Sequence, residues 1–153
     1  MSIAKITRIH EQAMDAAEKA FLIKDVNSAQ RKRLLRTAFE GEHAAAELAQ
    51  KTEVGEPTRS VLLRSAASLA LNCGKVREAE RLAALGLAGE PPAEIAEELR
   101  EVLERVQNVR QLEARGVTAD GGEPWGELAA MKRMMGDLTK RLSAVEKRTH
   151  AAV

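Results

Sequence analysis

The segment that decides the fold is NCGKVREAERLAALGLAGEPP, which runs from Asn72 to Pro92. Gly74 stands where one helix would end, because glycine adopts the left-handed backbone conformation of a helix terminus with little strain. Apolar residues then recur at a spacing of about 3.6, and Gly89 and Pro91 end the periodic run. These apolar positions are Val76, Ala79, Leu82, Ala83 and Leu87. The segment predicts a turn, a short amphipathic helix and a second turn.

This pattern resembles the second helix of a tetratricopeptide (TPR) repeat, a helix-turn-helix unit that stacks on further hairpins. The small residues fall at Gly74, Ala79 and Gly86, while Val76 and Ala83 stand where the repeat has aromatic side chains. The resemblance covers Arg59 to Pro92 as one clear repeat, with a degenerate repeat over Ala13 to Glu47. It implies a short stack of helical hairpins that binds other proteins.

The composition agrees with an all-α protein. The chain has 153 residues, 2% aromatic residues and no tyrosine, so strand-forming residues are scarce. The formal net charge of +1 predicts no field that would attract nucleic acid or an anionic membrane. The one cysteine, Cys73, cannot form a disulfide within the chain, which favours a cytoplasmic location and a packed thiol.

Two helices are expected before the clear repeat. Apolar and small residues follow helical spacing from about residue 3 to residue 24, at Ile3, Ile6, Ile9, Ala13, Ala17 and Ala20. Asn27 or Ser28 can cap a second helix, because both side chains accept hydrogen bonds from backbone amides at a helix start. The inward positions of that helix are Leu34, Leu35, Ala38, Phe39, Ala45 and Leu48.

Three further helices complete the predicted domain, residues 1–116. The first helix of the clear repeat follows Pro57 and runs through SVLLRSAASLALNCG, residues 60–74. The helix after Gly74 is the second, and a fifth begins at Pro91-Pro92 and ends at Gly116. Its inward residues are Ile95, Leu99, Val102, Leu103, Val106, Val109 and Leu112. Five helices in hairpin order predict a short right-handed solenoid or a bundle.

The rest of the chain is predicted to hold a flexible linker, residues 117–123, and a C-terminal amphipathic helix, residues 124–150. The linker is rich in glycine and has no periodicity. The helix carries apolar residues at the 3-4 spacing of a coiled-coil seam. The seam residues are Leu128, Met131, Met135, Leu138, Leu142 and Val145. Such a seam favours homo-oligomerisation or capture of a partner helix, and the alternative is a helix that caps the open end of the stack.

Little in the sequence indicates catalysis or a cofactor. The chain has no phosphate-binding glycine loop, no zinc-protease motif and no paired cysteines. A hairpin centred near Val26 would bring His10 and His43 to its open end beside Glu42, where a metal could bind. Isolated histidines are more often boundary residues, so we expect no metal and no cofactor.

The function that these observations predict is that of a non-catalytic adaptor for a protein or peptide partner. By the resemblance to TPR repeats, the groove would draw on Arg59, Leu62, Leu63 and Asn72 in the first helix of the clear repeat. The alternative is a small regulator that binds nucleic acid or neutralises a toxin through basic helices. Its strongest feature is the cluster of Arg31, Lys32, Arg33 and Arg36, which has no neighbouring aromatic residues to stack on bases. We therefore expect no nucleic-acid partner and no membrane partner.

Overall fold

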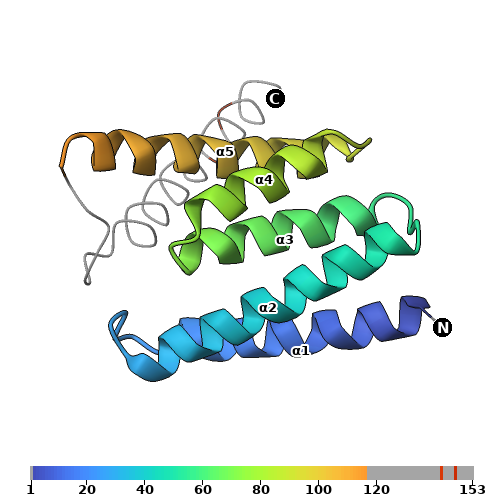
Figure 1. Cartoon of the computed structure of the whole chain (residues 1–153), viewed down its shortest axis with the longest axis horizontal. Coiled ribbons are helices and arrows are strands. Elements are labelled where there is room, and N and C mark those ends of the chain that lie inside the picture. The colour runs from blue at the N-terminus through green and yellow to red at the C-terminus, as the bar shows by residue number, and fades with distance from the viewer. Residues whose placement is uncertain (1, 117–141, 143–146, 148–153) are drawn as a thin grey trace. The chain divides into compact units, whose positions relative to one another are not determined.

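The protein is built from helices that follow one another as antiparallel hairpins (Figure 1). The computed structural model describes residues 2–116, 142 and 147. Residues 2–116 form α1 (Ser2–Leu22), α2 (Ala29–Lys51), α3 (Thr58–Asn72), α4 (Val76–Leu87) and α5 (Ala93–Ala114), with no strand among them. The predicted all-α class is confirmed.

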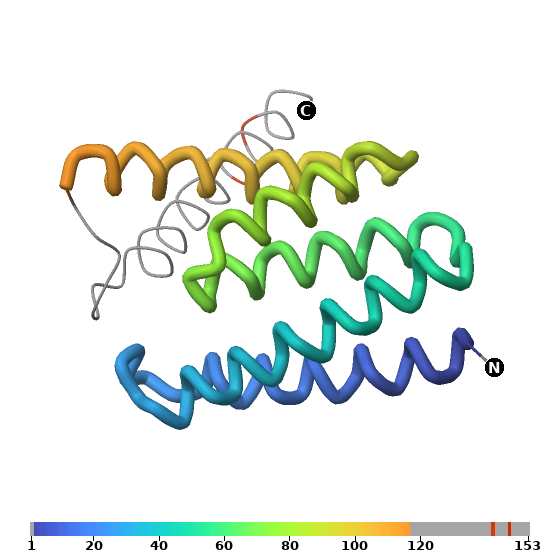
Figure 2. The backbone as a smooth tube through the Cα atoms, viewed as in Figure 1, coloured from blue at the N-terminus to red at the C-terminus, as the bar shows by residue number. Residues whose placement is uncertain are grey.

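The helices pack in chain order, and the backbone trace in Figure 2 follows this order from α1 to α5. Each helix contacts the next, and α3 also contacts α5. The chain divides into two compact units, Met1–Gly122 and Glu123–Val153. Within the first unit, α3, α4 and α5 form a mutually packed trio, whereas α1 is held chiefly by α2.

Small residues bring α1 and α2 close together. Ala13, Ala17 and Ala20 are buried along α1, and a Cβ built at Gly41 of α2 would lie 3.1 Å from the Cβ of Ala13. Close approach of this kind replaces bulky interdigitation as the means of burying the interface. Ile3 belongs to the predicted apolar stripe of this helix, yet its side chain is 67% exposed, whereas Ile6 in the next turn is 3% exposed.

Two predicted helix boundaries, at Ser28 and at Gly74, are confirmed by the capping geometry. Ser28 begins α2, and its Oγ accepts a hydrogen bond from the Arg31 amide at 3.4 Å. Gly74 has φ +73°, so the turn between α3 and α4 uses the left-handed conformation that favours glycine. The Lys75 amide donates to the Ala70 carbonyl at 2.8 Å and closes the end of α3.

Helix α3 is the centre of the stack. Every residue from Arg59 to Asn72 is buried or partly buried, because α2, α4 and α5 all pack against it. A helix covered on all sides needs little amphipathicity, and α3 has apolar or small residues around most of its circumference.

Helices α4 and α5 approach closely because Gly86 of α4 has no side chain. A Cβ at this position would lie 2.9 Å from Leu99 Cδ1 and 3.5 Å from Leu63 Cβ. Leu99 therefore occupies the space above Gly86, and α3, α4 and α5 meet at this point. Of the predicted inward residues of α5, Leu99, Val102 and Val106 are buried, while Ile95 and Leu103 are partly buried against the core.

The predicted linker, residues 117–123, and most of the predicted C-terminal helix lie outside the described residues. Of the six seam positions only Leu142 is described, and its side chain is 59% exposed. Leu128, Met131, Met135, Leu138 and Val145 lie outside the description. The seam and its role in oligomerisation stay predictions. Among the described residues, no helix combines the length and the apolar character that crossing a bilayer requires.

Candidate functional site: the surface between α2 and α4

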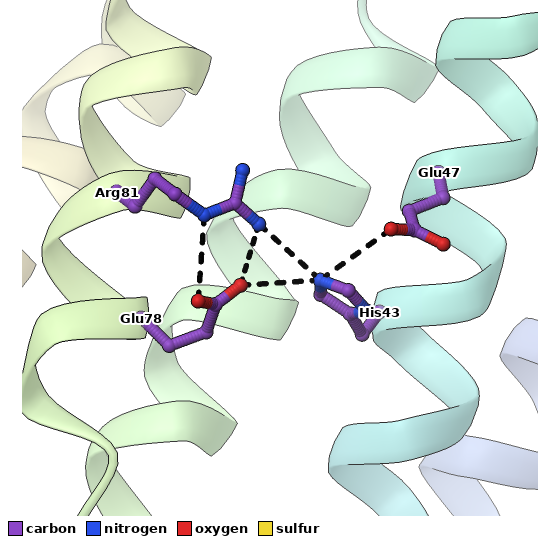
Figure 3. A network of polar contacts seen from close by, with 4 residues as sticks. All are labelled: His43, Glu47, Glu78 and Arg81. Carbon is purple, nitrogen blue, oxygen red and sulfur yellow. Dashed lines mark hydrogen bonds and ion pairs between the residues drawn. The ribbon is translucent and has the colours of Figure 1, made fainter.

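A network of polar side chains joins α2 to α4 on the surface of the stack (Figure 3). His43 Nε2 lies 3.2 Å from Glu78 Oε1 and 3.5 Å from Arg81 Nη2. Glu47, one turn further along α2, places Oε1 4.0 Å from the same nitrogen. The ring of His43 is thus held between two helices that are far apart in sequence.

The Glu78 and Arg81 side chains pair within α4. Arg81 Nη2 donates to Glu78 Oε1 at 2.5 Å and Arg81 Nε donates to Oε2 at 3.4 Å. The hydrogen bond from Arg81 keeps the pKa of Glu78 below its ordinary value, with the charge of Arg81 and the contact with His43 acting in the same direction against the effect of burial. Glu78 is therefore a carboxylate at neutral pH and presents a fixed negative charge to His43.

Beside this network the surface is hollowed into an open depression of about 570 Å³. Its wall on α2 is formed by Phe39 and His43, whose ring centroids lie 5.5 Å apart. The turn between α3 and α4 forms the opposite wall, where Lys75 Nζ sits 5.3 Å from the centroid of the Phe39 ring. The depression thus carries charged side chains of both signs beside a Phe39 side chain that is 6% exposed.

A second row of polar residues crosses the interior from α1 to α5. His10 Nδ1 lies 2.9 Å from both carboxylate oxygens of Glu42, and Glu42 is completely buried. Burial raises the pKa of Glu42, and hydrogen bonds from His10 and Ser65 and the charge of Arg64 oppose the rise. On the far side Arg64 forms an ion pair with Glu98 of α5.

The burial of Glu42 has a signal in the sequence. Glu42 falls on the same helical stripe as the buried residues Leu35, Ala38, Ala45 and Ala49. A carboxylate on an apolar stripe indicates a buried polar contact. By contrast, nothing in the sequence pointed to Glu78 or Arg81, because the side of α4 that faces His43 depends on how the two hairpins stack.

Two residues of the predicted partner-binding groove are inaccessible. Leu62 is 3% exposed and Leu63 is 0% exposed, and both belong to the central core. The prediction that they line a binding groove is wrong, since α3 is covered by neighbours on every side.

The other two groove residues lie at opposite ends of α3. Arg59 Nη2 donates to the Leu85 carbonyl at 3.0 Å, and Arg59 Nη1 lies 3.5 Å from Glu56 Oε1. A guanidinium on one of the last carbonyls of α4 stabilises that helix end. Asn72 is partly exposed at the last residue of α3. Arg59 thus has a place inside the fold, and the four predicted residues do not share one surface.

The proposed meeting of His10 and His43 is also corrected. His10 of α1 contacts Glu42, whereas His43 of α2 contacts Glu78 of α4, so the two histidines have different carboxylate partners. No group of three or more possible metal-ligating side chains is found in the part of the chain that the structure describes.

The basic cluster is divided between the interior and the surface of the protein. Arg31 is buried, and its guanidinium carbon lies 5.9 Å from the centroid of the Phe21 ring, whereas Lys32, Arg33 and Arg36 are exposed.

Cys73 is partly buried against the core, and burial raises the pKa of its thiol. A raised thiol pKa makes Cys73 a poor nucleophile at neutral pH.

Comparison with protein-family models, with curated proteins and with solved structures found no match to this chain.

Proposed function

We propose that this protein is a non-catalytic adaptor that binds a protein or peptide partner at the depression between α2 and α4. The observation that carries the proposal is an open depression bordered by charges of both signs, Lys75 and Glu78, beside the packed Phe39 ring. An open surface with ordered charges of both signs suits an extended peptide, because the charges orient the peptide by electrostatic complementarity.

The packing of the second hairpin supports a TPR-like adaptor. Helix α3 contacts both α4 and α5, and the small residues Ala79 and Gly86 are buried between helices. Stacked hairpins of this kind present an extended surface without needing a deep cavity. A homo-oligomer formed through Leu128 to Val145, and residence in the cytoplasm, complete the proposal.

A site-specific cross-linking experiment tests the adaptor function. A photoreactive residue in place of Arg77, which lines the depression, should capture a discrete partner from native lysate, and excess untagged protein should compete it away. The same residue in place of Glu104, exposed on α5, serves as the positional control.

Charge reversal then checks the surface itself. The double variant Lys75→Glu with Arg77→Glu should lose the captured partner in quantitative affinity purification. The matched variant Lys5→Glu with Arg8→Glu, which reverses two exposed charges of α1, should retain it. Equal recovery by both variants, or equal labelling from positions 77 and 104, contradicts binding at the depression.

The alternative function, a regulator that binds nucleic acid or a toxin, is favoured by one observation. Lys32, Arg33 and Arg36 are exposed together in the first two turns of α2. Phosphate backbones bind such clusters with a strong dependence on salt.

A further inference from the structure

The C-terminal end of α1 carries two adjacent, exposed apolar side chains. Phe21 is 52% exposed and Leu22 is 76% exposed, at the last two positions of α1. Two large apolar side chains that are adjacent and exposed to solvent form an apolar patch, and such patches often mark interaction surfaces.

Exposed cations occur in the same helical hairpin as these two side chains. Lys24 follows them in the turn, and Lys32, Arg33 and Arg36 project from the first two turns of α2. We call Phe21, Leu22, Lys24, Lys32, Arg33 and Arg36 the hairpin tip. The contact between Arg31 and the Phe21 ring brings the start of α2 against the end of α1, so the cations and the apolar pair lie at the same end of the α1–α2 hairpin.

The local charge of the hairpin tip differs from that of the whole chain. Residues 20–36 hold five Lys or Arg and one acid, Asp25, which gives a net charge of +4 against +1 for the full sequence. Asp25 Oδ1 already accepts a hydrogen bond from the Asn27 amide at 3.0 Å. The near-zero net charge of the whole sequence therefore does not reveal the strongly basic local charge of the hairpin tip.

The structure points to an anionic phospholipid surface as the occupant of the hairpin tip, and we propose that α1 and α2 dock there peripherally. Phe21 and Leu22 would enter the interface between headgroups and acyl chains, while the four cations contact anionic headgroups. A bilayer surface needs no concave receptor. Leu22, which is 76% exposed, would gain nothing from a phosphate backbone, and protein interfaces are depleted in lysine.

This inference goes beyond the proposed adaptor function and departs from the expectation of no membrane partner. That expectation rested on net charge, whereas membrane attraction acts within about 10 Å and depends on local charge. The hairpin tip and the chain's N terminus lie at opposite ends of α1, so the other end supplies an internal control (Figure 1). There Ile3 is 67% exposed, with exposed Lys5 and Arg8 beside it.

Co-sedimentation of the full chain with vesicles tests the proposal. We expect binding to phosphatidylcholine vesicles that contain about a third phosphatidylserine, and at least about tenfold weaker binding to pure phosphatidylcholine or in roughly 0.5 M salt. Phe21→Ser with Leu22→Ser, and separately Lys32→Glu with Arg33→Glu, should each weaken binding about tenfold or more. Ile3→Ser and the Lys5→Glu, Arg8→Glu pair should bind like the unchanged protein. All of these side chains are exposed, so circular dichroism should show that each variant folds.

A second measurement separates insertion from simple charge attraction. In a Cys73→Ala background, a polarity-sensitive dye on Leu22→Cys should shift to the blue on addition of the anionic vesicles, and the same dye on Ile3→Cys should not. Absence of binding, equal loss in the tip and control variants, or binding that ignores the Phe21 and Leu22 substitutions overturns the proposal. The last outcome, with competition by duplex DNA, would assign the cations to nucleic acid instead.

Discussion

His10 Nδ1 lies 2.9 Å from each carboxylate oxygen of Glu42, a side chain with no exposed surface at the junction of α1, α2 and α3. The groups that face this carboxyl are His10 from α1 and Ser65 and Arg64 from α3. Because His10 is partly exposed, the pair connects the interior to solvent through one imidazole ring.

The buried carboxyl predicts a specific dependence of stability on pH. The fold raises the pKa of Glu42 above its ordinary value of 4.5. A raised pKa means that the folded state binds this proton more tightly than the unfolded state, so the stabilisation is complete below pH 4.5 and is lost as the pH rises through the folded-state pKa. In urea unfolding, Glu42→Gln should therefore gain stability relative to the unchanged protein as the pH increases.

The comparison between the two proteins isolates Glu42, because the lowered pKa values of Glu56, Glu78 and Glu80 act in the opposite direction and are common to both. A constant difference in unfolding free energy between them from pH 4 to pH 9 would contradict a proton-linked role for Glu42.

Adding a side chain at Gly86 should destabilise the fold. Gly86→Val would press into Leu99 and Leu63, and overpacking of this kind costs about 1–3 kcal/mol. Ala84→Val, on the exposed face of the same helix, controls for the lower helix propensity of valine. Thermal unfolding of the two variants tests this prediction. Equal melting temperatures for Gly86→Val and Ala84→Val would show that the close approach of α5 to α4 does not depend on Gly86.

Arg59 should matter for stability and not for partner binding. Arg59→Ala removes a charged donor from the Leu85 carbonyl and should lower the free energy of unfolding by about 1–2 kcal/mol. Arg77→Ala, an exposed arginine in the first turn of α4, should change stability by less than about 0.5 kcal/mol. If chemical denaturation showed a larger loss of stability for Arg77→Ala than for Arg59→Ala, the partner-binding role of Arg59 that the TPR resemblance implied would be favoured instead.

Nucleic-acid binding decides between the two proposed functions. If Lys32, Arg33 and Arg36 contact a phosphate backbone, affinity for DNA or RNA must fall steeply as salt rises. We expect no binding at micromolar protein in fluorescence anisotropy. A steep salt dependence that disappears when these three residues become glutamine would favour the regulator over the adaptor.

The C-terminal seam makes a prediction about mass. If Leu128 to Val145 hold an oligomer together, a chain ending at Asp120 should sediment as a folded monomer, because α1 to α5 complete their own core. Leu138→Asp in the full chain should act likewise, since a carboxylate in a coiled-coil seam is desolvated against apolar neighbours. Three equal monomer masses would refute oligomerisation through the seam, and an unfolded truncation would favour a capping helix.

The sequence predicted the helices well because local signals determine them. Ser28 and Gly74 mark their boundaries through capping and backbone conformation, which depend on a few neighbouring residues. The site was predicted poorly because it depends on how hairpins stack. Leu62 and Leu63 were assigned to a groove by analogy, while the contact of His43 with Glu78 joins residues 35 positions apart. No periodicity within one helix encodes such a pair.

The enclosure of α3 by its neighbours has a consequence for how this protein can change over generations. Because every residue of α3 from Arg59 to Asn72 is buried or partly buried, few of its positions tolerate a large change of side chain, so α3 should drift most slowly in sequence, and mainly among residues of similar volume. The outer face of α1 is under no such restriction. New binding specificities should therefore arise at the two ends of the stack while its middle helix stays nearly unchanged.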